Sequence, residues 1–123
     1  HVDHAIVTDG CIINHSRISN SIVGLRSVVG EGCELRRVVS LGCDYFESAE
    51  SIRENEQLGR PRVGIGRNTR IENTIIDKDA RIGDNCVISP AGKPESMNHD
   101  LYFIRDGIVI IPKNGIIPHG TVI

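Results

Sequence analysis

The strongest constraint on the fold of this sequence is an aliphatic side chain that recurs at every sixth residue. Ile, Val and Leu fill 35 of the 123 positions, yet they occupy all 15 positions in runs of this period. The probability that positions of this period would all be aliphatic by chance is about three in a million. The free choice of phase raises this probability by a factor on the order of hundreds, which still leaves it small. The positions are Ile6, Ile12, Ile18, Val23, Val29, Leu35, Leu41, Ile65, Ile71, Ile76, Ile82, Ile88, Ile111, Ile117 and Ile123.

A second repeat, at a longer interval, supports the first. Residues 18–33 align with residues 71–86 at an offset of 53, and a five-residue step falls at the same place in both segments. Internal repetition of this kind is typical of solenoid proteins. The aligned segments share several identical residues: Asn20 with Asn73, Gly30 with Gly83, and Cys33 with Cys86.

A period of six does not suit one face of a long strand, where side chains alternate with a period of two. It suits a coil in which a short strand, a corner and another short strand repeat. We therefore predict an all-β fold, a left-handed parallel β-helix with three hexapeptides per coil. The left hand is that of the known class of hexapeptide β-helices, which departs from the usual right-handed crossover, and the sequence pattern by itself does not determine it. The fourth residue after each aliphatic position should share the interior: Ser16, Ile22, Ser27, Cys33, Val39, Thr69, Ile75, Ala80, Cys86, Gly115 and Thr121.

The composition agrees with strands and excludes several classes. Ile and Val number 30, against five Leu, four Ala and four aromatic residues, and β-branched side chains favour strands. The net charge of -2 gives no general attraction to nucleic acid or acidic membranes. No apolar run is long enough to span a membrane, the first residues do not resemble a signal peptide, and the four Cys lack C-x-x-C spacing. We expect a soluble, intracellular protein without a disulfide scaffold.

Two segments interrupt the repeat within a single predicted domain, residues 1–123. In residues 42–62, Asp44 and Glu47 predict the start of a short surface helix, and Gly59 and Pro61 predict its end. Residues 89–104 form a second protruding loop, and loops of this length are more often functional than not.

Few residues are candidates for chemistry. The spacing of the five His indicates no metal site, and His99 on the second loop is the one candidate general base, as an acyltransferase would need. Cys33 and Cys86 are predicted to be interior, whereas Cys43 is predicted to be accessible.

Two lysines are stronger candidates for anion binding. Lys78 and Lys113 lie at predicted corners, where side chains must point to solvent, in a chain with eleven Arg and only three Lys. Each Lys can act as a flexible point charge for an anion, and a purely solubilising role is equally consistent with the pattern.

Several motifs resemble the C-terminal domain of the ADP-glucose pyrophosphorylase (glucose-1-phosphate adenylyltransferase) family. They span nearly the whole chain in the order of that family, and the DYFE motif resembles its plant and cyanobacterial branch. The segment SPAGKPESMNHD departs from that branch. The matching segments are HSRISNSIVGLRS, GCDYFE, VGIGRN, IIDKDARIGDN and YFIRDGIVIIPKNGIIPHGTVI.

The resemblance implies that the chain is a fragment with no catalytic residues and no cofactor of its own. ATP and Mg²⁺ would bind to a nucleotide-binding N-terminal domain, which would be its partner along with other subunits of a tetramer. Lys78 and Lys113 would bind phosphorylated effectors such as 3-phosphoglycerate, with inorganic phosphate as a competitor. The enzyme would be cytoplasmic in a bacterium and plastidic in a plant, with no nucleic acid or membrane partner.

Two other readings of the residues stay open. One is a self-contained hexapeptide acyltransferase that uses His99, and the other is a purely structural β-helix assembly module.

Overall fold

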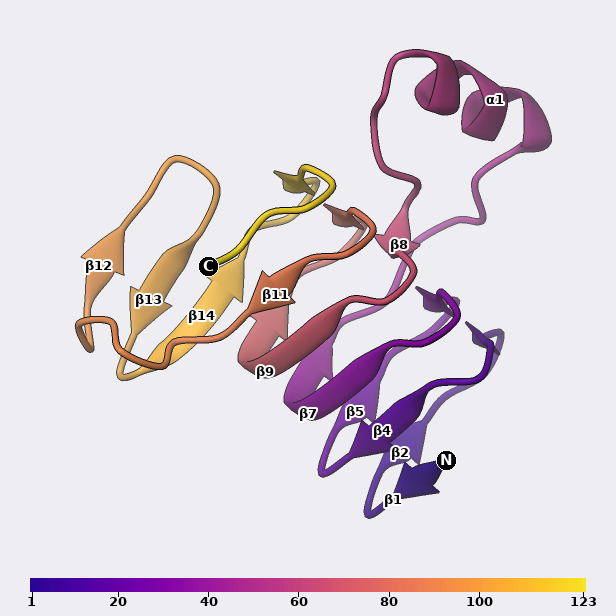
Figure 1. Ribbon diagram of the computed structural model, residues 1–123. Coiled ribbons are helices and arrows are strands. Elements are labelled where there is room, and N and C mark those ends of the chain that lie inside the picture. Colours follow the sequence, from indigo (N-terminus) through magenta and orange to yellow (C-terminus); the bar gives the residue numbers. More distant parts are fainter.

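The computed structural model describes residues 1–123, and the chain winds as a three-sided coil from one end of the molecule to the other (Figure 1). Fifteen short strands and one helix follow one another: β1 (Val2–Asp3), β2 (Ile6–Val7), β3 (Ile12–Ile13), β4 (Arg17–Ser19), β5 (Ile22–Val23), β6 (Val28–Val29), β7 (Glu34–Ser40), α1 (Ala49–Gln57), β8 (Gly64–Ile65), β9 (Arg70–Ile76), β10 (Arg81–Ile82), β11 (Val87–Ile88), β12 (Met97–Asn98), β13 (Phe103–Arg105), β14 (Ile108–Ile111) and β15 (Ile116–Ile117).

Parallel pairing stacks the strands of successive coils into three sides. Side 1 contains β1, β4, β11 and the first halves of β7 and β9. Side 2 contains β2, β5, β14 and the second halves of β7 and β9. Side 3 contains β3, β6, β8, β10 and β15. The predicted parallel β-helix with three sides per coil is therefore confirmed.

The strand register gives the length of each coil. Ile18 pairs with Leu35, Leu35 with Ile71, and Ile71 with Ile88, so successive coils advance by 17, 36 and 17 residues. The 53-residue offset seen in the sequence is therefore two coils. The long coil contains the first of the two predicted loops.

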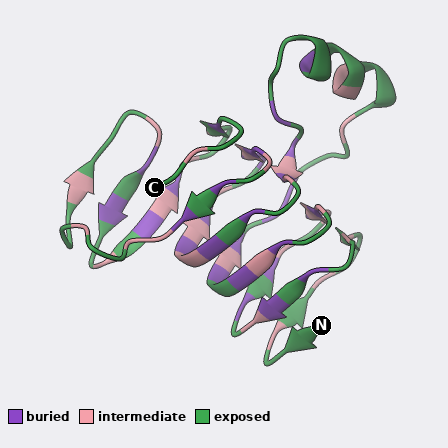
Figure 2. Cartoon of the chain, in the orientation of Figure 1, coloured by how far each residue is buried: buried purple, intermediate pink, exposed green.

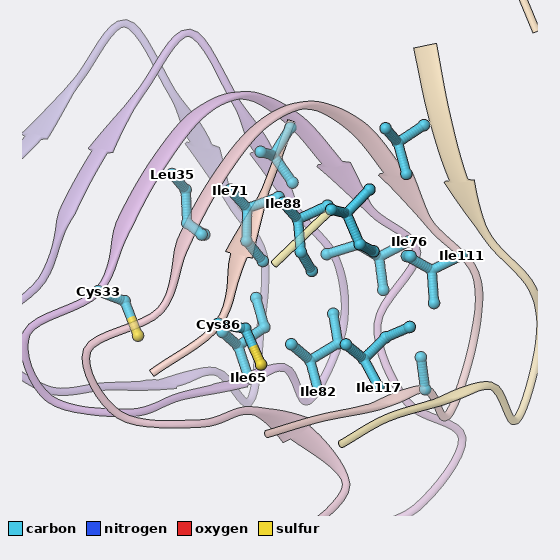
Figure 3. Close-up of a cluster of buried hydrophobic side chains, with 14 of the residues drawn as sticks. Cys33, Leu35, Ile65, Ile71, Ile76, Ile82, Cys86, Ile88, Ile111 and Ile117 are labelled. Atoms are coloured by element: carbon cyan, nitrogen blue, oxygen red, sulfur yellow. The ribbon is translucent and has the colours of Figure 1, made fainter. Parts of the chain in front are cut away.

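Aliphatic side chains fill the interior in layers, one from each side of each coil (Figure 3). Twelve of the fifteen predicted interior positions are buried, and side chains such as Ile18, Val29 and Ile88 are completely enclosed. Burial is weakest in the first coil, where β1 and β2 are exposed along their whole length (Figure 2).

The other three predicted interior positions are wrong, because the coil advances by five residues at two steps where six was applied, from Leu35 to Ser40 and, in the first coil, from Ile13 to Ile18. Leu41 is 45% exposed, and Ser40 occupies the interior position instead, in register with Ile76. In the first coil, Ile6 and Ile12 are 61% and 49% exposed. The residues that follow them, Val7 and Ile13, lie in register with the buried Val23 and Val29.

The same five-residue step corrects part of the prediction for the smaller interior residues. Ile22 is exposed, and Val39 and Ile75 are only partly buried. The residue before each of them is buried instead: Ser21, Val38 and Thr74.

On the six-residue sides, most of the predicted small residues lie in the interior, and several bond one coil to the next, whereas Gly115 and Thr121 of the last coil are only partly buried. Thr69 Oγ1 donates a hydrogen bond of 2.7 Å to the carbonyl oxygen of Gly83. The Cys33 thiol donates to the carbonyl oxygen of Gly66 at 2.8 Å. These bonds satisfy polar groups that the interior would otherwise leave without partners.

The first loop forms an arm, defined here as residues 43–63, that carries α1 away from the coil (Figure 1). The predicted helix is present but begins later than expected. Its N-cap is Ser48, whose hydroxyl accepts a hydrogen bond from the Ser51 N–H, and Asp44 and Glu47 lie outside it. The helix ends before Gly59, which has a φ of +69° as a helix stop requires.

Glu47 fixes the arm to the coil. Its Oε1 accepts a hydrogen bond of 3.0 Å from the Val63 N–H, and its Oε2 accepts bonds of 2.8 Å from Ser51 and Asn55. Its Oε2 also pairs with Arg81 of β10 at 2.9 Å, in a contact that leaves the Glu47 side chain only 5% exposed. This buried ion pair is therefore one of the contacts that attach the base of the arm to the coil.

The second loop returns as an antiparallel extension of side 2. β12 pairs with β13, and β13 pairs with β14, which is itself a strand of side 2. Tyr102 and Ile104 of this loop are buried in the core cluster.

The single helix, α1, does not have the length and apolar character of a membrane-spanning helix.

Candidate functional site

Lys78 and Lys113 lie at equivalent positions of two consecutive coils. Ile76 of β9 pairs with Ile111 of β14, so each Lys follows an interior residue by two positions. The next residues, Asp79 and Asn114, both have a φ of +59°, which turns the chain at the corner between sides 2 and 3. Adjacent strands lie about 4.8 Å apart, so the two Lys backbones are neighbours on one edge of the coil.

Asp44 of the arm completes this corner. Its Oδ1 accepts a hydrogen bond of 3.1 Å from Lys78 Nζ, and its N–H donates to Asp79 Oδ1 at 2.9 Å. The hydrogen bond from Lys78, together with the charges of Lys78 and Lys113, holds the pKa of Asp44 below its usual value. We call Asp44, Lys78 and Lys113 the lysine corner.

The lysine corner has two positive charges and one negative charge within reach of solvent, and the carboxylates of Asp77 and Asp79 lie beside it, where they accept backbone hydrogen bonds. Lys78 and Asp44 are each about half exposed, and Lys113 is exposed. Ion pairs between exposed side chains are weak, so a phosphate or carboxylate group can replace Asp44 as the partner of Lys78. A ligand anion there would also be close to Lys113. The arrangement suits reversible binding of a small anion.

Sequence reasoning singled out both lysines but missed Asp44, which it assigned to a helix start. The signal for a different role was Ser48, a better N-cap residue that stands directly before the helical segment. With the helix starting there, Asp44 is free to lie on the corner.

The other candidate residues have structural contacts. The His99 ring stacks on Tyr102 with 4.5 Å between ring centroids, and its Nδ1 accepts a hydrogen bond from the Leu101 N–H. His119 Nδ1 accepts a hydrogen bond of 2.7 Å from the Asp84 N–H. Each of these bonds occupies the Nδ1 atom and orients the ring.

Three of the four cysteines are buried, including one that was predicted to be accessible, and Cys11 is partly buried. Cys43 is only 6% exposed, because its N–H bonds to the Leu25 carbonyl and draws the start of the arm onto the coil. Burial raises the pKa of the Cys33, Cys43 and Cys86 thiols. A raised pKa disfavours the reactive thiolate.

A groove of about 630 Å³ lies between the arm and side 3. Arg60, Arg62 and Arg67 line it, but so do the carboxylates of Glu31 and Asp84. Because the two signs of charge are mixed, the groove does not select for one class of ligand.

Comparisons with known proteins identify the family. Residues 1–122 match the family described as the GLGC left-handed parallel beta-helix domain, which also confirms the predicted hand. The chain is 43% identical over 122 residues, 98% of its length, to glucose-1-phosphate adenylyltransferase large subunit 1, chloroplastic/amyloplastic, from Zea mays, and covers 24% of that protein. It is 38% identical over 124 residues, 99% of its length, to the chloroplastic/amyloplastic small subunit from Triticum aestivum, and covers 26% of it.

A third relative is a glucose-1-phosphate adenylyltransferase small subunit sequence from Zea mays. The identity is 40% over 126 residues, which is 99% of this chain and 100% of that sequence. The chain thus spans about a quarter of the length of the other two relatives. The matched region is the whole coil with its arm and hairpin, and the chain belongs to the GLGC left-handed parallel β-helix domain family.

Proposed function

We propose that this chain is the regulatory and subunit-contact domain of a glucose-1-phosphate adenylyltransferase. The observation that carries the proposal is the match over the entire chain to subunits of that enzyme, at 38% to 43% identity. The whole enzyme would make ADP-glucose and pyrophosphate from ATP and glucose 1-phosphate, for glycogen or starch synthesis.

The chemistry of this reaction would take place outside the described chain. The phosphate of glucose 1-phosphate would attack the α-phosphorus of ATP, with pyrophosphate as the leaving group. Mg²⁺ bound elsewhere in the enzyme would offset the negative charge that develops in this step. The β-helix would contribute by binding effectors and by holding subunits together, in a plastid or in a bacterial cytoplasm.

We assign effector binding to the lysine corner. A phosphorylated carboxylic acid such as 3-phosphoglycerate carries two anionic groups, and the neighbouring Lys78 and Lys113 offer two ammonium groups. Inorganic phosphate would compete for the same charges. Asp44 already pairs with Lys78 at 3.1 Å, so an anion that takes over this contact competes with Asp44.

An effector at the corner changes activity only if it binds one arrangement of the enzyme more tightly than another. The corner lies where the arm leaves the coil, and Asp44 joins the two through Lys78 and Asp79. Displacement of Asp44 would therefore alter the contact between arm and coil. This is a direct route from effector binding to a change in packing.

The test uses the full-length enzyme and its activation by 3-phosphoglycerate. We expect Lys78→Ala and Lys113→Ala each to raise the effector concentration for half-activation at least tenfold, with basal activity unchanged. Lys93→Ala, on the second loop, is the matched control and should leave the curve unchanged. Asp44→Asn should lower the half-activating concentration, because the competing carboxylate is removed. Unchanged curves for both corner lysine variants would refute the effector assignment.

A further inference from the structure

One peptide group at the start of the arm is held from both sides. The carbonyl oxygen of Cys43 accepts a hydrogen bond of 2.9 Å from Arg26 Nε. The N–H of Asp44, in the same peptide group, donates a hydrogen bond of 2.9 Å to Asp79 Oδ1. We call Arg26 and Asp79 the charged clamp.

The charged clamp follows from the register of the coil. Ser40 pairs with Val23 in the coil before it and with Ile76 in the coil after it. The third residue after each of these is a clamp residue or Cys43, so all three occupy the same corner in successive coils. Adjacent strands lie about 4.8 Å apart, so each clamp residue can reach the peptide between them.

The backbone shows why this corner needs a clamp. Arg26 and Asp79 have φ values of +54° and +59°, which turn the chain from side 2 to side 3. Cys43 does not have a positive φ, and there the chain leaves the coil as the arm, between β7 and β8 (Figure 1). The Asp44 N–H makes no backbone hydrogen bond and uses a side-chain acceptor instead.

Both bonds of the charged clamp involve a charged group. Hydrogen bonds with one ionised partner are roughly twice as strong as bonds between neutral groups. Asp79 is only 6% exposed, Arg26 is partly buried, and neither side chain is in an ion pair. The peptide group is therefore the partner of both charges, and it is held firmly for the start of a surface loop.

The held peptide fixes the direction of Asp44. A peptide group is planar, so fixing its carbonyl oxygen and its N–H also fixes where the next Cα lies. Asp44 is the first side chain after this peptide, and its carboxylate lies 3.1 Å from Lys78 Nζ. Lys78 directly precedes Asp79, so the clamp and the ion pair use consecutive residues of one corner.

We propose that Arg26 and Asp79 are positioning residues, which hold the Cys43–Asp44 peptide so that Asp44 stays on Lys78 as a built-in competitor for anions. The positioning of Asp44 is independent of the proposed function. Its consequence for activation rests on that function, because it requires the lysine corner to bind the effector.

The first test measures the pKa of the Asp44 carboxyl in this chain, by NMR during an acid titration. In the wild type, the hydrogen bond from Lys78 holds this pKa below its usual value. Asp79→Gly removes the acceptor and tolerates the positive φ of the corner, and Arg26→Ala removes the donor. In both variants Asp44 should leave Lys78, and its pKa should rise toward 3.8.

Asp79→Asn and Arg26→Gln are the matched controls. Asn keeps an oxygen for the Asp44 N–H, and the amide nitrogen of Gln is as many bonds from the backbone as Arg26 Nε. Both controls can make the clamp bonds without the charges, so the pKa of Asp44 should stay low. Circular dichroism and unfolding temperatures establish which variants are folded, and each half of the clamp is tested by its own pair.

Two results would overturn the proposal. One is a pKa of Asp44 that stays at the wild-type value in the folded Asp79→Gly and Arg26→Ala variants. The other is a rise of equal size in the matched controls, because the two hydrogen bonds would then not be what holds Asp44.

The second test uses activation of the full-length enzyme by 3-phosphoglycerate. Asp79→Gly and Arg26→Ala should each lower the half-activating concentration by roughly threefold. Neither should lower it further in combination with Asp44→Asn, because the three changes remove the same competitor. If the pKa of Asp44 rises but activation is unchanged, the clamp positions Asp44 as proposed and the effector assignment is wrong.

Discussion

Replacing Glu47 with Gln tests whether one buried ion pair holds the arm on the coil. The Glu47 carboxylate accepts four hydrogen bonds, from the Val63 N–H, Ser51, Asn55 and Arg81. A Gln side chain has one acceptor oxygen, so its NH₂ group must face at least one of these donors. A buried donor without an acceptor costs about 1–3 kcal/mol, and loss of the partner charge of Arg81 adds to it.

We expect Glu47→Gln to destabilise the contact between the arm and the coil by about 3 kcal/mol. This cost is less than for a fully buried ion pair, because Arg81 still donates a hydrogen bond to the Pro61 carbonyl at 3.0 Å. If the arm opens by itself, amide hydrogen exchange in α1 accelerates by roughly 150-fold. If the whole chain unfolds together, the unfolding temperature falls by about 12 °C. Hydrogen exchange and thermal unfolding together measure which of the two occurs.

The pH dependence of the same contact has a defined sign. Burial raises the pKa of Glu47, but hydrogen bonds from Val63, Arg81 and Ser51 outweigh it and leave the pKa below its usual 4.5. A carboxyl whose pKa is lowered by folding stabilises the folded state fully at pH values above its pKa in the unfolded chain. This contribution is lost as the pH falls through its pKa in the folded chain. Protection of α1 should therefore decrease below about pH 4.5 in the wild type, and Glu47→Gln should remove this dependence.

Glu50→Gln is the matched control, since Glu50 is an exposed carboxylate in the first turn of α1. It should change stability by less than about 0.5 kcal/mol. The double variant of Glu47→Gln with Arg81→Gln should cost less than the sum of the single variants, because the two side chains contact each other. Exchange in α1 that is the same in Glu47→Gln and the wild type would show that the ion pair does not hold the arm.

Two further predictions concern the coil itself. Gly66→Ala should destabilise the protein by about 3 kcal/mol or more, because its Cβ would lie 2.5 Å from the Gly83 carbonyl carbon of the next coil. Gly92→Ala, with open space around it, should cost only about 1–2 kcal/mol for its positive φ, and equal unfolding temperatures for the two variants would contradict this reasoning. Thr69→Val should cost about 1–3 kcal/mol, since the Cys86 N–H loses its side-chain acceptor at 3.2 Å. Urea unfolding measures the loss of unfolding free energy. A loss near zero would mean that the hydrogen bonds of interior hydroxyl and thiol groups between coils add no stability.

The interior could be predicted from the sequence because its period is a direct consequence of the coil. An aliphatic residue at every sixth position has no other arrangement that buries all of its members, and Ile71, Ile82 and Ile117 are indeed buried. The errors arose because a strict period of six was applied where the coil advances by five residues, from Leu35 to Ser40 and from Ile13 to Ile18. The sequence contained the first kind of step twice, at Ile18–Val23 and Ile71–Ile76, and extending it to every coil would have corrected Leu41. It would not have corrected Ile6, because the step between Ile13 and Ile18 belongs to the first coil alone.

The lysine corner was harder to predict because it combines residues of the coil with one residue of the arm. Lys78 and Lys113 could be placed at corners from the repeat alone, and their register now makes them neighbours. The partner Asp44 depends on how the arm leaves the coil, which no periodicity describes. The burial of Cys43 depends on the same path.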